Sequence, residues 1–446
     1  MTHRIASLCR LGFRAPFSSR FVWALLPALA LIVLLLPAGL KNDGTKAGEI
    51  RMILTWTFGP AFAVLAAATM WTGCAALSSD IEEGRHTGTA VSPARPLEIW
   101  LGRWLGLVLT NAVVLLLVTA GIYAQLRLRG LSAADIAVVR RLDISQESVM
   151  RETRAIYAQA VKAGAVREGV EEAAVLESIR GVFLNDMMSV EPGRQRDWDF
   201  VLRKGDERKT VSIAFAAISS LGSTFGCKGE INVFGAGANA PAEPAHTHTI
   251  TEDDGGRAGF EIPAGSLPPG NFRVTYMNVG DRTNGVSALV RHNESMTASV
   301  PGGGALSNIV LCAAILLSLL SALAGIGVTL GAMFSFPVAA FAGAAVVLTA
   351  FAVGGGMEEE AADFEHSHDK EESSRAVTAL TRFSVGTSRA IAYAYKPFIE
   401  ANVFDRLGDK ILLDSRLVAA SAIRTGLLLP LIFGFMAALT LRRREL

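Results

Sequence analysis

The chain of 446 residues is 51% hydrophobic and only 19% charged, whereas about 25% of residues are charged in an ordinary soluble domain. This composition excludes a disordered, collagen-like or disulfide-stapled chain. Lys and Arg number 42 and Asp and Glu number 41, so no overall positive field is present to attract nucleic acid.

Six apolar blocks are long enough to cross a bilayer, which takes about 20 residues of helix. Since the hydrocarbon offers no water to backbone groups, each block must be helical, and a proline inside one only bends it. A cleaved signal peptide is an alternative for the first block, but its apolar core is longer than the usual 7–15 residues. The sequence therefore predicts an α-helical polytopic membrane protein with six transmembrane helices, at residues 21–40, 52–77, 104–124, 307–331, 334–354 and 422–441.

Lys and Arg in the short segments between these blocks set the expected orientation, because such residues accumulate on the cytoplasmic side. Residues 1–20 carry four arginines and no acid, and residues 442–444 are all arginine. The loop 41–51 lies outside in this orientation, yet it carries three basic residues, which favours the opposite orientation. The two termini together carry more basic residues than this loop does. We therefore expect a multi-pass protein of the cell membrane, inner or plasma, with both termini in the cytoplasm.

That orientation leaves residues 128–304 outside the cytoplasm, as an inserted extracytoplasmic α+β domain. From 195 to 301, short runs with a period of two are separated by Gly, Pro, Asn and Asp, which predicts a β-sandwich of about eight strands. In the earlier part, 128–190, apolar residues recur at three- and four-residue spacing. This spacing predicts helices at 132–142, 145–164 and 170–184.

The other two domains follow from the same assignments. Residues 1–127 hold the cytoplasmic N-terminus, three spans and a loop at 78–103. Residues 305–446 hold the other three spans, an extracytoplasmic loop at 355–417 and a basic cytoplasmic tail.

Cysteine and histidine patterns point to no metal or cofactor. Cys227 is the one cysteine expected in the exported domain, so we expect no disulfide there and interpret Cys227 as a small buried residue rather than a reactive thiol. Each of two histidine pairs has a spacing that allows both rings to reach one ion, but two ligands do not make a tetrahedral site. A polar strand and a solvated acidic loop account for them, although metal binding stays open for both pairs, His246 with His248 and His366 with His368.

Sequence motifs of catalysis are missing from the chain. It has no phosphate-binding loop of the form GxxxxGK[ST], no HExxH, no GxSxG and no paired CxxC. The predicted spans lack a relay of carboxylates, which disfavours a proton- or sodium-driven transporter. Asn111 is the one strongly polar residue well inside a span, and we expect it to hydrogen-bond a neighbouring helix rather than a substrate. We predict a protein that is not an enzyme.

The informative stretch is the loop between the second and third spans. It begins with the acidic residues Asp80, Glu82 and Glu83, continues through a turn-rich segment, and restarts as an amphipathic helix at 97–99. Such a segment lies along the membrane face and offers a partner a charged edge and a helix. An ordinary interfacial loop is the alternative.

These residues resemble the first cytoplasmic loop of the type-two permeases of ATP-binding-cassette (ABC) transporters, particularly the branch associated with gliding motility and with maturation of multicopper enzymes. The resemblance continues at 330–344, 404–416 and 441–446 and covers everything except the exported domain, which departs from the compact family pattern. The loop residues on the family pattern are Asp80, Ile81, Glu82, Arg85, Thr89, Pro93, Arg95, Glu98, Gly102 and Arg103, where Arg103 stands in place of the more common Lys.

The resemblance implies a permease subunit that couples ATP hydrolysis by a separate ATPase subunit to transport, with export expected. It implies that a second permease protomer completes the transporter, as a homodimer or heterodimer, within the lipid bilayer. Neither the substrate nor the direction of transport is carried over. The ATPase-coupling residues are then expected to be Ile81, Glu82, Glu83, Arg85, Pro93, Arg95 and Glu98.

Two other classes of function fit the same sequence. One is an ABC-type mechanical transmitter that moves an exported partner without transport. The other is a membrane-anchored receptor whose extracytoplasmic β-sandwich binds the ligand. A neighbouring ATPase gene separates the receptor from the other two, and substrate flux in vesicles separates the permease from the transmitter.

Overall fold

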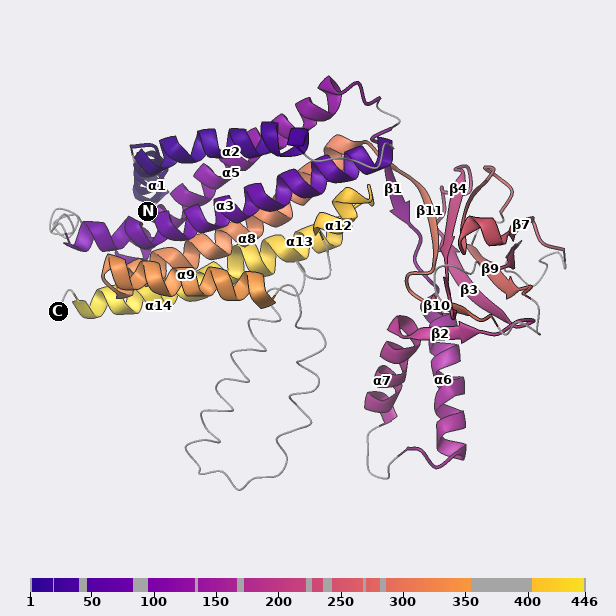
Figure 1. Cartoon of the computed structure of the whole chain (residues 1–446). Coiled ribbons are helices and arrows are strands. Elements are labelled where there is room, and N and C mark those ends of the chain that lie inside the picture. Colours follow the sequence, from indigo (N-terminus) through magenta and orange to yellow (C-terminus); the bar gives the residue numbers. More distant parts are fainter. Residues whose placement is uncertain are drawn as a thin grey trace. The chain divides into compact units, whose positions relative to one another are not determined.

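The computed structural model describes residues 2–18, 20–39, 46–82, 95–132, 135–166, 172–221, 227–235, 243–267, 270–280, 286–353 and 403–444. The chain divides into two compact units (Figure 1). We call Met1–Val138 with Gly304–Leu446 the helical unit, and Val139–Gly303 the β unit. The β unit begins at residue 139 rather than at 128, because Leu131 and Ile136 are buried in the core of the helical unit.

The helical unit consists of long apolar helices and a few short ones. The two longest helices, α3 and α5, have 37 and 33 residues. In α3 the helix continues through Pro60, as the sequence predicts. The described elements are α1 (Thr2–Ser18), α2 (Arg20–Gly39), α3 (Lys46–Glu82), α5 (Pro96–Leu128), α8 (Ala305–Met333), α9 (Phe336–Val353), α12 (Val403–Gly408), α13 (Ser415–Ile423), a π-helical segment η2 (Arg424–Leu428) and α14 (Leu429–Arg444).

Four helices in the described part of the chain are long and apolar enough to cross a membrane, so the prediction of six spans is not met. The four contain the predicted second, third, fourth and sixth spans, and they are Gly48–Ser78, Pro96–Leu128, Ala305–Met333 and Ser415–Arg442. The predicted first and fifth spans lie on shorter apolar helices, Trp23–Pro37 and Phe336–Leu348, of 10–17 residues. These two apolar stretches lie within α2 and α9, which have 20 and 18 residues as whole helices.

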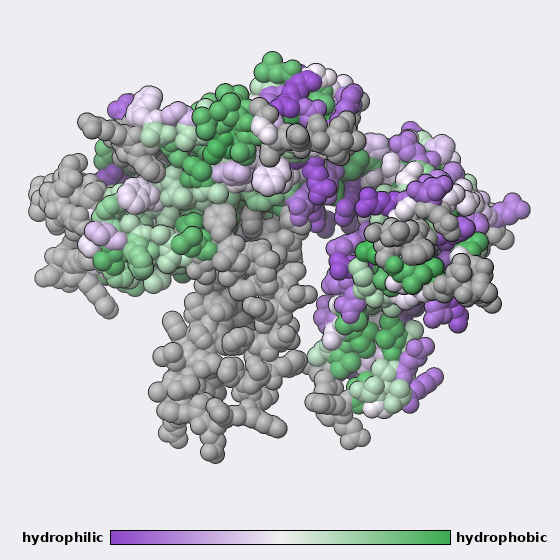
Figure 2. Space-filling view, in the orientation of Figure 1, coloured by the Kyte–Doolittle hydropathy of each residue, from purple (hydrophilic) through white to green (hydrophobic). Residues whose placement is uncertain are grey.

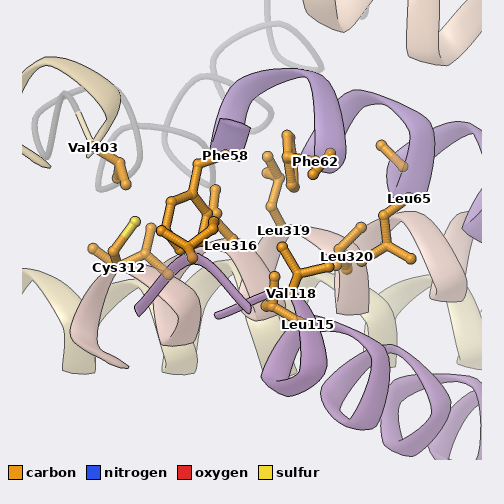
Figure 3. Close-up of a cluster of buried hydrophobic side chains, with 14 of the residues drawn as sticks. Phe58, Phe62, Leu65, Leu115, Val118, Cys312, Leu316, Leu319, Leu320 and Val403 are labelled. Atoms are coloured by element: carbon orange, nitrogen blue, oxygen red, sulfur yellow. The ribbon is translucent and has the colours of Figure 1, made fainter. Parts of the chain in front are cut away.

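The core of the helical unit lies between α3, α5 and α8 (Figure 3). Phe58, Phe62 and Leu65 of α3 project into it from one side, and Leu115 and Val118 of α5 from another. A row of α8 side chains fills the space between them. Apolar side chains also cover much of the outer face of this unit, as Figure 2 shows, whereas hydrophilic residues cover much of the β unit.

The end of α3, the start of α5 and the end of α14 lie at one end of the helical unit, which we call the loop end (Figure 1). Leu77 near the end of α3, Trp100 near the start of α5, Ala332 near the end of α8 and Ala437 of α14 share one apolar cluster there. Asn308 near the start of α8 hydrogen-bonds residues 411 and 413 at the other end. The end of α3 and the start of α5, which flank residues 83–94 in the sequence, therefore lie beside the ends of α8 and α14.

The described residues of the β unit form two α-helices, a short 3-10 helix η1 (Glu252–Asp254) and eleven strands. The α-helices are α6 (Gln146–Lys162) and α7 (Glu172–Asn185), which confirm the predicted second and third helices. The strands are β1 (Val138–Arg141), β2 (Met187–Val190), β3 (Gln195–Leu202), β4 (Val211–Ala216), β5 (Ile218–Ser219), β6 (Gly229–Gly235), β7 (His246–Ile250), β8 (Arg257–Ile262), β9 (Gly270–Asn278), β10 (Ala288–Arg291) and β11 (Met296–Gly303).

Two four-stranded sheets pack on one apolar core, and this arrangement agrees with the predicted β-sandwich. Their strand orders are β1-β11-β4-β8 and β3-β9-β6-β7, and a third sheet has the order β2-β10-β5. Phe215 of the first sheet stacks on Tyr276 of the second, with ring centroids 4.5 Å apart. Cys227 is a buried free thiol of this core, as predicted.

The predicted helix at 132–142 is wrong, because its second half forms β1. The segment has apolar residues at helical spacing, but β1 pairs with β11, a strand that lies far along the sequence. Strand formation depends on such packing partners more than on local propensity. The pairing continues at Leu142, whose backbone N–H donates to the Ala298 carbonyl over 2.8 Å.

Candidate functional site

Only part of the predicted coupling set is described, and that part lies at the loop end. Ile81 and Glu82 belong to the last turn of α3, where the backbone alone is described. Three more, Glu83, Arg85 and Pro93, fall outside the described residues. The remaining two, Arg95 and Glu98, are seen with their side chains, so the visible part of the site is the start of α5.

Glu98 closes the first turn of α5. Its carboxylate accepts a hydrogen bond from the Arg95 backbone N–H over 3.1 Å, and the Glu98 N–H donates to the Arg95 carbonyl over 2.8 Å. Pro96 follows at the first helical position, where its fixed φ suits a helix start. Glu98 is 4% exposed and Arg95 is exposed. Arg95 is thus open to a partner, whereas the buried Glu98 carboxylate holds the helix start.

Two tryptophans fix the next turn of α5 to α8. Trp100 and Trp104 stack with ring centroids 5.5 Å apart. The Trp100 indole N–H donates to the Thr329 hydroxyl and the Trp104 N–H donates to the Ser321 carbonyl, each over 3.1 Å. Trp100 is fully buried and also lies against α14, where a Cβ on Gly434 would be 2.5 Å from its ring. The start of α5 is therefore packed and hydrogen-bonded against α8 and packed against α14.

The N-terminal helix α1 packs directly on the same part of α5. A Cβ on Gly102 would lie 2.4 Å from the Leu8 Cβ, and one on Gly106 would lie 2.5 Å from the Gly12 carbonyl carbon. Small residues allow two helix backbones to approach this closely. The spacing of Gly102 and Gly106 was the available sequence signal for this contact, but α1 itself was not predicted.

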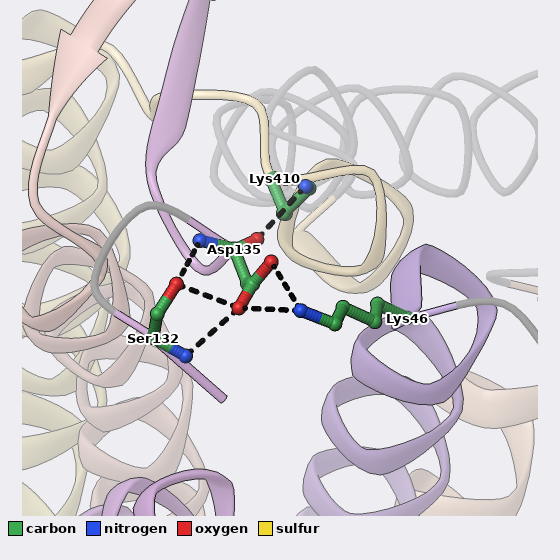
Figure 4. Close-up of polar contacts among 4 residues, drawn as sticks. All are labelled: Lys46, Ser132, Asp135 and Lys410. Carbon is green, nitrogen blue, oxygen red and sulfur yellow. Dashed lines mark hydrogen bonds and ion pairs between the residues drawn. The ribbon is translucent and has the colours of Figure 1, made fainter. Parts of the chain in front are cut away.

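The opposite end of the helical unit carries a polar cluster around Asp135 (Figure 4). The Asp135 carboxylate accepts from the Ser132 N–H over 2.9 Å and from its hydroxyl over 2.6 Å, and it pairs with the Lys46 ammonium at 3.2 Å. The Lys410 ammonium donates to the Asp135 carbonyl over 3.1 Å. Hydrogen bonds from Ser132, and then Lys46, lower the pKa of Asp135 to about 2. The cluster ties the segment after α5 to α3 and to the α12–α13 connection, and sequence patterns did not reveal it.

The histidines of β7 have a packing role in the structure. The rings of His246 and His248 both stack on Phe260 of β8, at 4.9 and 4.8 Å between centroids. Among the residues that the structure describes, no group of three or more His, Cys, Asp or Glu side chains is arranged to hold a metal ion. The second predicted pair, His366 and His368, lies outside those residues.

The partly buried Arg196 and the buried His292 form a pair between α7 and the sheets of the β unit. Nη2 of Arg196 is 3.3 Å from Nδ1 of His292, and the guanidinium lies over the Phe183 ring at 5.1 Å. The His292 ring packs between Phe183 and Trp198, with centroids 4.6 and 5.7 Å away. Burial, and then the Arg196 charge, lower the pKa of His292 to about 4, so the ring is neutral at pH 7.

Comparison with known proteins gives no relative on which to base a function. No family model, no curated protein and no solved structure matches this chain.

Proposed function

We propose that the chain is the membrane-spanning permease subunit of an ABC transporter, and that a separate ATPase chain docks on the loop end. In this proposal the loop end, with both termini, faces the cytoplasm of the cell membrane, and the β unit faces the exported side. A second permease protomer completes the transporter. The observation that carries the proposal is that the start of α5, which follows the loop 83–94 in the sequence, is held by hydrogen bonds and packing against neighbouring helices.

The anchoring supplies a route for mechanical work. Residues 83–94 connect α3 to α5, and Trp100 and Trp104 connect the start of α5 to α8 by hydrogen bonds. A partner that pushes on the loop therefore moves α3, α5 and α8 together rather than bending a free segment. The missing phosphate-binding loop agrees with an ATPase on another chain.

A mechanical transmitter without transport is the second candidate, and one observation favours it. The chain enters the β unit through β1 and leaves it through β11, and these are neighbouring strands of one sheet. A single residue, Gly304, separates β11 from α8. The first and last strands of the β unit are therefore neighbours, and the last continues almost directly into α8, which suits transmission of a movement from the helices to an exported partner.

The experiment that tests the docking site is co-purification of the ATPase with loop variants of the full chain. Glu82→Lys, Arg85→Glu and Arg95→Glu are combined, because one exposed ion pair contributes less than about 1 kcal/mol. Glu98 is spared because its buried carboxylate holds the helix start. Arg416→Glu, a charge reversal of an exposed residue at the opposite end, is the matched control.

We expect the triple variant to lose the ATPase at moderate salt and the Arg416 control to retain it. Equal retention by wild type and triple variant over a range of salt concentrations would exclude the loop as the docking site. Flux of candidate substrates into vesicles, measured with the intact complex, separates the permease from the transmitter.

A further inference from the structure

A small cavity lies inside the helical unit between α2, α3 and α5. Its volume is about 20 Å³, a little more than the roughly 10–15 Å³ that one water molecule requires. Leu25 of α2, Leu65 of α3 and Val114 of α5 form apolar parts of its wall. Its polar lining consists of the hydroxyl and amide residues Thr69, Thr72, Thr110 and Asn111.

Asn111 leaves part of its amide unpaired beside this cavity. The side chain is 6% exposed, its Oδ1 lies 3.0 Å from the Thr69 hydroxyl, and its Nδ2 has no hydrogen-bond partner. The interhelical hydrogen bond to Thr69 confirms the role predicted for Asn111, but it uses one end of the amide only. An unpaired amide group in an apolar interior is unfavourable, and a ligand atom that bonds to it relieves that penalty.

The nearby hydroxyls leave the amide as the free polar group of the site. Thr72 and Thr110 each donate to a carbonyl of their own helix, over 2.8 and 2.9 Å. The Thr69 hydroxyl is 2.6 Å from the Leu65 carbonyl as well as 3.0 Å from Asn111, and its single hydrogen serves only one of these oxygens. Hence at least one polar atom of the Asn111 amide remains available, whichever way round the amide lies.

The residues that line and border the cavity also indicate that a ligand is uncharged and largely apolar. Among the residues that the structure describes, no titratable side chain lines the cavity, so a charged group placed there would have no partner from them in an apolar interior. Val113 and Leu117 of α5 lie three residues after Thr110 and Val114, and they are 39% and 57% exposed. Residues three apart are neighbours on a helix surface, so the cavity borders an exposed apolar strip of α5.

We infer that this cavity is a binding site within the membrane for the hydroxyl or carbonyl group of a neutral, otherwise apolar amphiphile. The polar group bonds to the Asn111 amide, and the apolar remainder lies along the α5 strip beside Val113 and Leu117. The inference rests on the proposed permease function, because it names the class of molecule that such a protein would take from the bilayer. A single water molecule is the competing occupant.

The test uses the full chain in lipid nanodiscs and two photoactivatable probes. One is a long-chain primary alcohol that carries a diazirine, and the other is the matching diazirine alkane without the hydroxyl. Labelled peptides are identified by mass spectrometry. Asn111→Leu removes the amide, and Thr119→Val is the matched control, since the buried Thr119 hydroxyl donates to the Leu115 carbonyl of its own helix.

We expect the alcohol to label the peptides that contain Leu25 and Val114 and the alkane to label them about fivefold less, as one added hydrogen bond implies. Unlabelled long-chain alcohol should compete on the wild-type chain, a measurement that does not depend on the folding of a variant. Asn111→Leu should reduce labelling by the alcohol to the level of the alkane, and Thr119→Val should not.

Equal labelling by the two probes, together with no competition, would mean that the cavity holds only water and would overturn the inference. The labelling needs no ATPase, so this result would leave the proposed function standing. In contrast, a chain that shows the expected labelling but binds no ATPase would contradict the proposed function and leave the binding site intact.

Discussion

Gly106 of α5 and Gly12 of α1 lie in direct backbone contact: a Cβ built on Gly106 would be 2.5 Å from the Gly12 carbonyl carbon. Any side chain at residue 106 therefore forces the two helices apart. The contact fastens the N-terminal helix to the turn of α5 that follows Trp104. Both helices meet at the loop end, where the ATPase is proposed to dock.

Gly106→Val is expected to separate α1 from α5 and to lower the stability of the full chain by about 1–3 kcal/mol, the usual range for overpacking. Thermal unfolding in detergent measures this effect. Gly59→Ala in α3 is the control, because a Cβ there meets nothing within 4 Å. That variant should be neutral or slightly stabilising. Equal unfolding temperatures for the Gly106 variant and wild type would contradict the contact.

Asn308 of α8 holds the chain between α12 and α13. It is 1% exposed, its Nδ2 donates to the Ile411 carbonyl over 3.1 Å, and its Oδ1 accepts from the Leu413 N–H over 2.9 Å. Asn308→Ala leaves two buried backbone groups unpaired, which should lower stability by about 2–4 kcal/mol. Ser307→Ala next to it removes an exposed hydroxyl and should change stability by less than about 0.5 kcal/mol. Chemical denaturation of the two variants compares them, and similar losses would show that the Asn308 bonds do not matter.

The sequence was sufficient for elements whose pattern is local. Four of the six predicted spans are long helices, and α6 and α7 match their predictions, because apolar periodicity and length are enough to define a helix. Sequence patterns gave a wrong prediction where the secondary structure of a segment depends on partners that are distant in the sequence. β1 depends on β11, so the period of residues 132–142 misled the prediction. The helices α2 and α9 also lie where the apolar blocks 21–40 and 334–354 predict them, although they are not among the four helices that are long and apolar enough to cross a membrane.

His292 is expected to make the β unit sensitive to acid. The Arg196 guanidinium has no acceptor atom, so His292 Nδ1 must be unprotonated to accept its hydrogen bond. The pKa of His292 is lowered from 6.5 to about 4, so its contribution to stability is complete above pH 6.5 and is lost as pH falls towards 4. The loss is about 3 kcal/mol, since each unit of pKa shift corresponds to about 1.4 kcal/mol.

Thermal unfolding of the full chain between pH 7.5 and 4 measures this loss, with His292→Phe as the comparison. Phe preserves the packing between Phe183 and Trp198 but cannot take up a proton. The variant should be less stable at pH 7 and show a flatter pH dependence than wild type. Parallel pH profiles for the two proteins would mean that other groups carry the acid sensitivity.

The sequence indicated which charged residues belong to the candidate site, but it did not indicate which contacts hold the start of α5 in place. Arg95 and Glu98 were named from the resemblance to the permease loop, and that role stays a prediction; the sequence did not reveal that Glu98 is buried and bonded to the Arg95 N–H. The two tryptophans that fasten α5 were missed, because their partners Thr329 and Ser321 lie on α8, more than 200 residues away. Side-chain contacts of this kind leave no periodic signal.

ATP hydrolysis is expected to depend on a partner chain. The purified protein alone should hydrolyse no ATP, because its sequence has no loop of backbone N–H groups and lysine to hold the phosphates. Addition of the co-purified ATPase should produce turnover that the combined Glu82, Arg85 and Arg95 reversal reduces. Release of phosphate from ATP by the isolated chain, at a rate that scales with its concentration, would refute this prediction.

The β unit is expected to fold without the helical unit. Residues 139–303 carry their own core, in which Trp198, Ile231 and Val274 are fully buried. A soluble fragment of these residues should show mixed helix and strand by circular dichroism and unfold in one cooperative transition. Cys227→Ala should leave the fold intact and lower stability by about 1 kcal/mol, because the buried thiol is free and contributes packing alone. A fragment that is unfolded in buffer, or one that needs an oxidant to fold, would show that the sheets depend on contacts or bonds outside this unit.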